Sequence, residues 1–208
     1  MFATRLIIMP GERALAAVRD VTTQTKEASA LLTKVFDQNN SEDDKDLLRI
    51  TEVSNLCNAM VRQNAERLKH SFASSFDRED IYALVLGMST IVHQLEMLAI
   101  SVRRCQLRQY PPEMIGLAGG IRSIVLEFDE LAPLLNRPKE LQRRLPGARR
   151  LQEESQELSE EAVGKLFRSG LGVTDTVMYK DLYDHFDAVL ERCQYVVSIM
   201  ERISIKQG

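Results

Sequence analysis

A short block of charged residues, Asp77-Arg78-Glu79-Asp80, stands directly before a long run without charge. Charged side chains this close together could form a chemical site. The block also has the features of a helix start. Asp77 can accept a backbone N–H from Glu79 or Asp80 as an N-cap, and Asp80 stands at N3, the acidic position of a capping box. We interpret the block as a structural helix start, with a chemical site as the alternative.

Polar residues at helical spacing recur inside two apolar stretches. Ser54 and Asn58 interrupt an apolar stripe of 3/4 spacing, and Ser89, His93 and Glu96 share one face of the segment that follows the charged block. Residues four apart lie on the same side of a helix. The spacing therefore predicts two inward-facing polar stripes, whose chemistry the residues alone do not define.

Motifs of enzyme active sites are missing from the sequence. The glycine-rich stretch "GLAGG" (116–120) lacks the Lys and Ser/Thr of a phosphate-binding P-loop. No nucleophile motif is present, and the three histidines are scattered along the chain. We therefore expect a protein without catalytic residues.

Composition excludes several classes of protein. The 208 residues have a net charge of −3, 27% charged and 44% apolar residues, which is typical of a globular protein. A nucleic-acid binder would show a basic excess, so we expect no nucleic-acid partner. No stretch of 18 residues is free of charge, and the apolar patch before Pro10 is too short for a signal peptide. Three well-separated cysteines fit a reducing compartment, so a cytoplasmic protein is expected.

The elements that hold these residues are predicted to be helices. Strand patterns are rare, and Pro, Gly, Asn and Ser cluster at a few breaks, including one from Asn136 to Gly147. The breaks leave six predicted helices over 12–38, 42–72, 77–109, 112–136, 148–169 and 174–206. Long helices joined by short turns pack as antiparallel neighbours. The sequence predicts an all-α bundle.

A faint internal duplication is also visible. A shift of 98 residues superposes the second and third predicted helices on the fifth and sixth. It aligns Leu68 with Leu166, Asp77 with Asp175, and Leu84 with Leu182. Self-similarity at a fixed period indicates repeated structural units.

One motif links the chain to a known family. The stretch "FDREDIYAL" (76–84) after "ERLKHSF" (66–72) resembles the PhoU-like family, in particular its branch of accessory proteins to Pit-type phosphate transporters. That branch reads approximately F-x-T-P-F-D-R-E-D-I, and here Ser74-Ser75 replace Thr-Pro. The segment "KDLYDHFDAVLERC" (180–193) resembles the family's last helix. The resemblance extends over nearly the whole chain.

The resemblance implies a fold and a function. The fold is a single PhoU-like domain over 1–208, built as two pseudo-symmetric three-helix bundles, with repeat 1 over about 1–109 and repeat 2 over about 110–208. The implied function is non-enzymatic. It is an accessory or regulatory role in inorganic phosphate transport, by contact with a Pit-type membrane transporter.

The resemblance also implies positions for metal ligands. PhoU-like proteins hold metal clusters with Glu/Asp-x-x-x-Asp motifs. Those motifs map here to Ser54 and Asn58, Ser89 and His93, Gln152 and Gln156, and Asp187 and Glu191. Six of these eight positions have no carboxylate. We expect no cofactor beyond weak binding of a divalent cation or iron at Asp187 and Glu191. The alternatives are a solvated polar face on that helix, or a hybrid site that adds His93 and Glu96.

Other functions remain open on the sequence. A metal-dependent helical scaffold or enzyme could use the remaining acids. A helical oligomerisation module unrelated to phosphate would instead form a homo-oligomer. The basic segment "NRPKELQRRLPGARR" (136–150) could contact an anionic membrane or an acidic partner, although a solvated junction is the simpler interpretation.

Overall fold

The chain folds into a bundle of long helices. The computed structural model describes residues 10–37, 44–69, 77–106 and 110–208. The helices are α1 (Pro10–Asp37), α2 (Asp44–Lys69), α3 (Arg78–Cys105), α4 (Pro112–Leu131), α5 (Pro138–Phe167) and α6 (Val173–Gln207), with the 3₁₀ helix η1 (Ala132–Asn136) after α4. The described part of the chain contains no strand. The predicted all-α class with six long helices is confirmed.

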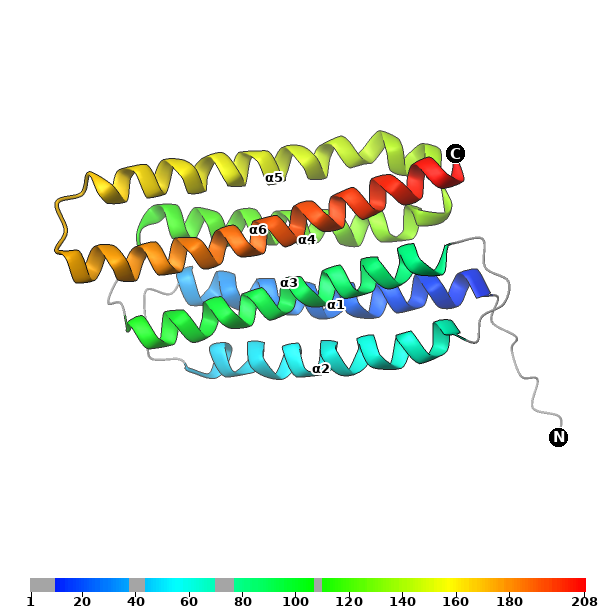
Figure 1. Cartoon of the computed structure of the whole chain (residues 1–208), viewed down its shortest axis with the longest axis horizontal. Helices are drawn as coiled ribbons and strands as arrows, with labels where there is room; N and C mark the ends of the chain where they lie inside the picture. Colours follow the sequence, from blue (N-terminus) through cyan, green and yellow to red (C-terminus); the bar gives the residue numbers. More distant parts are fainter. Residues whose placement is uncertain (1–9, 38–43, 70–76, 107–109) are drawn as a thin grey trace.

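All six helices run along the long axis of the molecule (Figure 1). Helices α1, α2 and α3 pack against one another on one side, and α4, α5 and α6 pack on the other. The two groups meet where α3 packs on α6 and α1 packs on α4. The core therefore continues through the middle of the molecule from one group to the other.

Helix α3 is central because its sequence is apolar almost all round. It contacts α1, α2 and α6 and buries large side chains such as Leu84, Met88 and Leu95. A helix without a polar face is stable only when neighbours surround it. Length and composition alone would also allow this helix to cross a membrane, and among the described residues no other helix meets that test. Its packing on three other helices is that of a core helix.

The start of α5 differs from the prediction. The expected break from Asn136 to Gly147 is wrong, because α5 begins at Pro138 and continues through Pro146. Pro138 occupies the first turn, where a missing N–H has no cost. Pro146 removes one backbone hydrogen bond. Leu141, Leu145 and Ala148 on either side of it are buried on one helical face, so packing maintains the helix.

Candidate functional site

A polar groove lies between α5 and α6 and is the main candidate site. Its volume is about 520 Å³. It is lined by Gln152, Glu153, Gln156, Glu157 and Glu160 of α5 and by Asp187, Glu191 and Gln194 of α6. Residues three or four apart share a helical face, so each helix presents one polar row to the other. The groove forms where the polar rows of the antiparallel helices α5 and α6 face each other.

The groove brings together the four motif positions of the second half. Gln152 is buried and Gln156 is half-buried on α5, opposite Asp187 and Glu191 on α6. The Ser159 hydroxyl donates a hydrogen bond of 2.6 Å to Asp187 Oδ1. This bond fixes the Asp187 carboxylate at the groove wall, whereas Glu191 is exposed to solvent.

The charge of the groove has one sign. Five of its eight lining residues are Asp or Glu, and none is Lys, Arg or His. Carboxylates gathered without a counter-charge attract cations, because their mutual repulsion falls when a positive group enters. A groove with this lining is chemically suited to a cationic group.

A metal cluster does not fit this donor set. A multiply charged cluster requires several carboxylates, whereas Gln152 and Gln156 are neutral amides. Among the described residues, no three or more His, Cys, Asp or Glu side chains are grouped so as to hold a metal ion. The hybrid site with His93 and Glu96 is therefore not assembled. Whether Asp187 and Glu191 bind a single cation stays a prediction.

The motif positions of the first half are arranged differently. Ser54 on α2 and Ser89 on α3 are buried, but Asn58 and His93 are exposed. The prediction that both members of each pair face inward is wrong at the second position. Four residues advance a helix by about 40° beyond a full turn, which moves that position to the edge of a narrow buried stripe. His93 Nδ1 lies 3.3 Å from the Glu96 carboxylate on the same helix.

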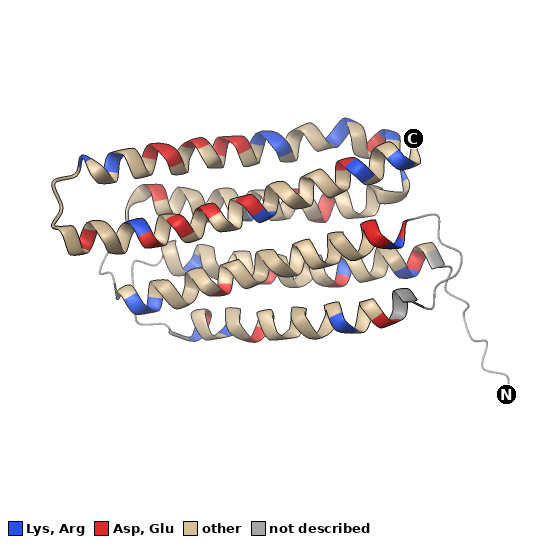
Figure 2. Cartoon of the chain, viewed as in Figure 1, with Lys and Arg blue, Asp and Glu red and all other residues tan. Residues whose placement is uncertain are grey.

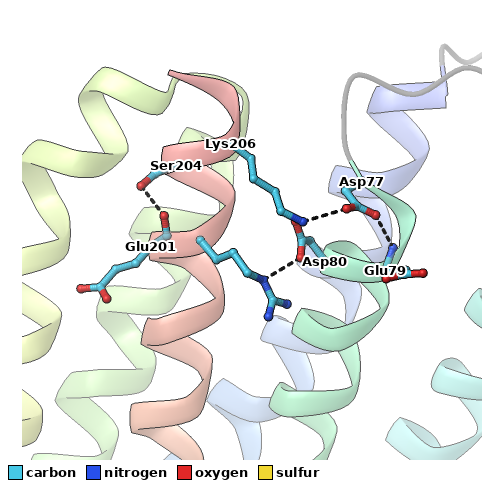
Figure 3. Close-up of polar contacts among 7 residues, drawn as sticks. Asp77, Glu79, Asp80, Glu201, Ser204 and Lys206 are labelled. Carbon is cyan, nitrogen blue, oxygen red and sulfur yellow. Dashed lines mark hydrogen bonds and ion pairs between the residues drawn. The ribbon is translucent and has the colours of Figure 1, made fainter.

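The charged block before α3 joins the two halves of the molecule. Asp77 is the N-cap, and its carboxylate accepts the Glu79 N–H at 3.0 Å, as predicted. The Asp80 carboxylate is buried and accepts a hydrogen bond of 2.7 Å from Arg202 Nε of α6, and Lys206 Nζ lies 2.8 Å from it. Asp80 thus forms ion pairs across the interface between α3 and α6 instead of completing a capping box (Figure 3).

Lys206 also donates to Asp77 at 2.8 Å, so Asp77, Asp80, Arg202 and Lys206 form one network, here termed the α3–α6 clasp. The hydrogen bond from Lys206 and that from the Glu79 backbone lower the pKa of Asp77. The same contacts with Asp77 and Asp80 raise the pKa of Lys206. Neither Arg202 nor Lys206 was predicted from the sequence as a partner of the charged block. Their i,i+4 spacing near the end of α6 places both on one helical face, but it does not indicate which acids they would contact.

The basic segment 136–150 is largely neutralised by acids. Arg137 pairs with Glu140, Arg144 with Glu127, Arg149 with Glu201, and Arg150 with Glu154. Exposed pairs of this kind contribute little to stability, but they leave few free charges for an anionic partner. The interpretation as a solvated junction therefore fits better than a membrane contact at this segment.

Comparison with known proteins gives a clear result for the fold. The sequence matches no protein-family model and no curated protein. One similar solved structure is that of a protein from Shewanella oneidensis described as a PhoU-like phosphate regulatory protein. It has a TM-score of 0.81 and 15% identity, covering 93% of this chain and 99% of that chain.

A second similar structure is that of a PhoU-like protein from the same organism. Its TM-score is 0.74 at 15% identity, and it covers 92% of this chain and 99% of that chain. The expected PhoU-like fold is therefore confirmed over almost the whole length. At this identity the likeness concerns the fold, and function requires a separate argument.

Proposed function

We propose that this chain is a non-enzymatic accessory or regulatory protein of inorganic phosphate transport. It acts in the cytoplasm by contact with a Pit-type membrane transporter. The main observation in support is the fold, which matches over 93% of the chain a protein described as a PhoU-like phosphate regulatory protein. The "FDREDI" stretch (76–81), which resembles the Pit accessory branch, supports the more specific assignment.

The α5–α6 groove is the surface we assign to the transporter. Cytoplasmic loops of membrane proteins have an excess of Lys and Arg. A groove lined by five carboxylates and no cation is complementary to such a loop. The exposed acids Glu157 and Glu191 would meet the loop first, and the half-buried Asp187 is held in place by Ser159.

The test is affinity capture of the tagged chain from gently solubilised membranes of its source cells, at high and at low phosphate. Recovery of a phosphate transporter in stoichiometric amount is the expected result. The Asp187→Asn/Glu191→Gln double variant should recover at least several-fold less of it. The matched control is Asp20→Asn/Glu130→Gln, which removes two exposed acids outside the groove. Recovery of the tagged chain without a transporter would overturn the proposal.

The alternative function is a cation-dependent scaffold, which would use Asp187 and Glu191 of the same groove. Its test is elemental analysis of the purified chain. We expect less than one metal ion per chain, because two of the four motif positions in the groove are amides. One or more transition-metal ions per chain, lost in Asp187→Asn, would instead favour the scaffold.

A further inference from the structure

Gln152 places a carboxamide without a partner in the wall of the α5–α6 groove. Its side chain lines the groove, and the residue is only 8% exposed. The carboxamide forms no hydrogen bond with any residue that the structure describes. It offers one acceptor oxygen and two N–H donors, and nearly buried groups of this kind almost always have a partner. The groove wall therefore holds a hydrogen-bonding group that a ligand could complete.

The other buried polar side chains of α5 are Ser155 and Ser159, and both have partners. The Ser155 hydroxyl donates a hydrogen bond of 2.8 Å to the Leu151 carbonyl oxygen. The Ser159 hydroxyl donates to the Asp187 carboxylate at 2.6 Å. Gln152 is thus the exception on this face of α5, and its amide is free to turn its oxygen toward the groove.

The register of the two helices places this amide close to a carboxylate. The bond between Ser159 and Asp187 sets one level of the antiparallel pair. About two turns of helix beyond it, Gln152 lies opposite Gln194, and both line the groove. Glu191, which also lines the groove, stands about one turn (~5.4 Å) from that level. A neutral acceptor and a carboxylate are therefore neighbours along the groove.

The charge of this region is negative on both helices. Figure 2 shows acids along the middle of α5 and along the part of α6 beside it. Residues 151–164 of α5 include Glu side chains and no Lys or Arg. The two cations that precede this stretch are engaged, since Arg149 pairs with Glu201 and Arg150 with Glu154. A cation from outside the chain would complete the site.

We propose that the α5–α6 groove selects arginine over lysine in its partner, and that Gln152 determines this preference. The guanidinium donates to Gln152 Oε1 on one edge and to the Glu191 carboxylate on another. The inference rests on the proposed function, in which the groove receives a basic loop. It adds which basic side chain the groove takes and which of its residues reads it.

The shapes of the two cations explain the preference. A guanidinium is planar and carries five N–H donors along its edges, so it can reach acceptors that lie on different sides of it. An ammonium group has three donors on a single nitrogen. The guanidinium is also more weakly hydrated, so it loses less when it meets a nearly buried amide. Carboxylates alone would discriminate less, because attraction between charges does not depend on such geometry.

An ordered water molecule is the competing partner for the amide, since waters commonly satisfy such groups. In that case Gln152 would take no part in selecting the ligand. The acids of the groove would then attract Lys and Arg side chains to a similar extent. The preference for arginine, and its dependence on Gln152, therefore separate the two possibilities.

The test is titration calorimetry of the purified full chain with an oligo-arginine and an oligo-lysine peptide of equal length, at low salt. The wild type should bind the arginine peptide at least about tenfold more tightly, because it gains a charge-assisted hydrogen bond. Gln152→Leu, which keeps a similar volume without polar atoms, should reduce the preference to about twofold or less. Gln152→Glu keeps an acceptor oxygen and should keep the preference.

The matched control is Gln63→Leu, which replaces an exposed glutamine of α2 outside the groove and should leave the preference unchanged. Each variant should melt as the wild type does, which shows that it folds. Equal affinity of the wild type for the two peptides, or an unchanged preference in Gln152→Leu, would overturn the proposal. Binding of neither peptide would also overturn it.

These outcomes are distinct from failure of the proposed function. The peptides contain no transporter, so the capture experiment is independent of them. If the tagged chain captures a transporter but shows no preference for arginine, the function stands and the role of Gln152 is wrong. If the preference is present and depends on Gln152 but no transporter is captured, the groove selects arginine in some other partner.

Discussion

Helix α6 presents ionised side chains on two of its faces, and the two faces differ in how those charges are satisfied. On the face toward α3, Arg202 and Lys206 meet acids of opposite charge in the clasp. On the face toward α5, Asp187 and Glu191 meet further carboxylates and neutral amides. Paired charges fix one helix against another, whereas charges of one sign remain available to a partner. Helix α6 thus carries a stabilising surface on one face and a candidate recognition surface on another.

The largest expected effect is on the clasp. Asp80→Ala removes the buried acceptor of Arg202 and Lys206. Hydrogen bonds to charged groups contribute about 1.5–3 kcal/mol each, and both cations are partly exposed and can be rehydrated. We expect a loss of about 2–3 kcal/mol in the free energy of unfolding, measured by urea denaturation. Asp80→Asn, which keeps the shape and one acceptor oxygen, should lose less. Equal stability of Asp80→Ala and wild type would contradict the structural role.

The next effect concerns the close approach of the same two helices. A Cβ atom at Gly87 would lie 3.0 Å from Val196 Cγ2, so α3 and α6 are nearly in contact there. Gly87→Leu would force the helices apart and should destabilise the fold by about 1–3 kcal/mol in thermal unfolding. Gly119→Leu is the control, because a Cβ there has no heavy atom within 4 Å.

Substitutions in the α5–α6 groove should weaken binding and leave stability almost unchanged, in contrast to those between α3 and α6. Asp187→Asn/Glu191→Gln should change the free energy of unfolding by no more than about 0.5 kcal/mol, because reduced repulsion offsets the weaker bond from Ser159. Its affinity for an oligo-arginine peptide should fall several-fold in titration calorimetry at low salt. The control Asp20→Asn/Glu130→Gln should retain the affinity. A clear loss of stability in the groove variant would mean that the groove charges are structural after all.

The smallest expected effect is the pH dependence of the stability that Asp77 contributes. Its pKa is lowered in the folded state, chiefly by Lys206. A group with a depressed folded pKa contributes stability above its unfolded pKa, near 4, and that contribution is lost as the pH falls through the folded pKa. The difference in melting temperature between wild type and Asp77→Asn should therefore be present at pH 7 and diminish below pH 4. A difference that is independent of pH would exclude this ionic contribution.

Local patterns predicted much of this fold. Turn residues at the breaks predicted six helices, the uncharged run predicted the central position of α3, and the Asp77 cap was recognisable from neighbouring residues. The clasp could not be predicted, because Asp80 and Arg202 are 122 positions apart and nothing local relates them. The start of α5 was predicted wrongly for a related reason. Packing of buried residues on both sides of Pro146 stabilises the helix by more than the proline destabilises it. The antiparallel pairing of α5 with α6 followed from their short connection. The groove also required their polar rows to face each other, and the residues alone left a solvated face on α6 as an equal interpretation.

The clasp also has a consequence for the order of events during synthesis. Ribosomes synthesise the chain from its amino end. Helices α1, α2 and α3 therefore leave the ribosome and can pack together before α6 has been made. At about 5–20 residues per second, the roughly 100 residues that separate α3 from the end of α6 take several seconds to translate. During that interval Asp80 lacks Arg202 and Lys206 as partners, and the apolar face of α3 that later packs on α6 is exposed. The nascent first half is therefore the species on which we expect chaperones to act.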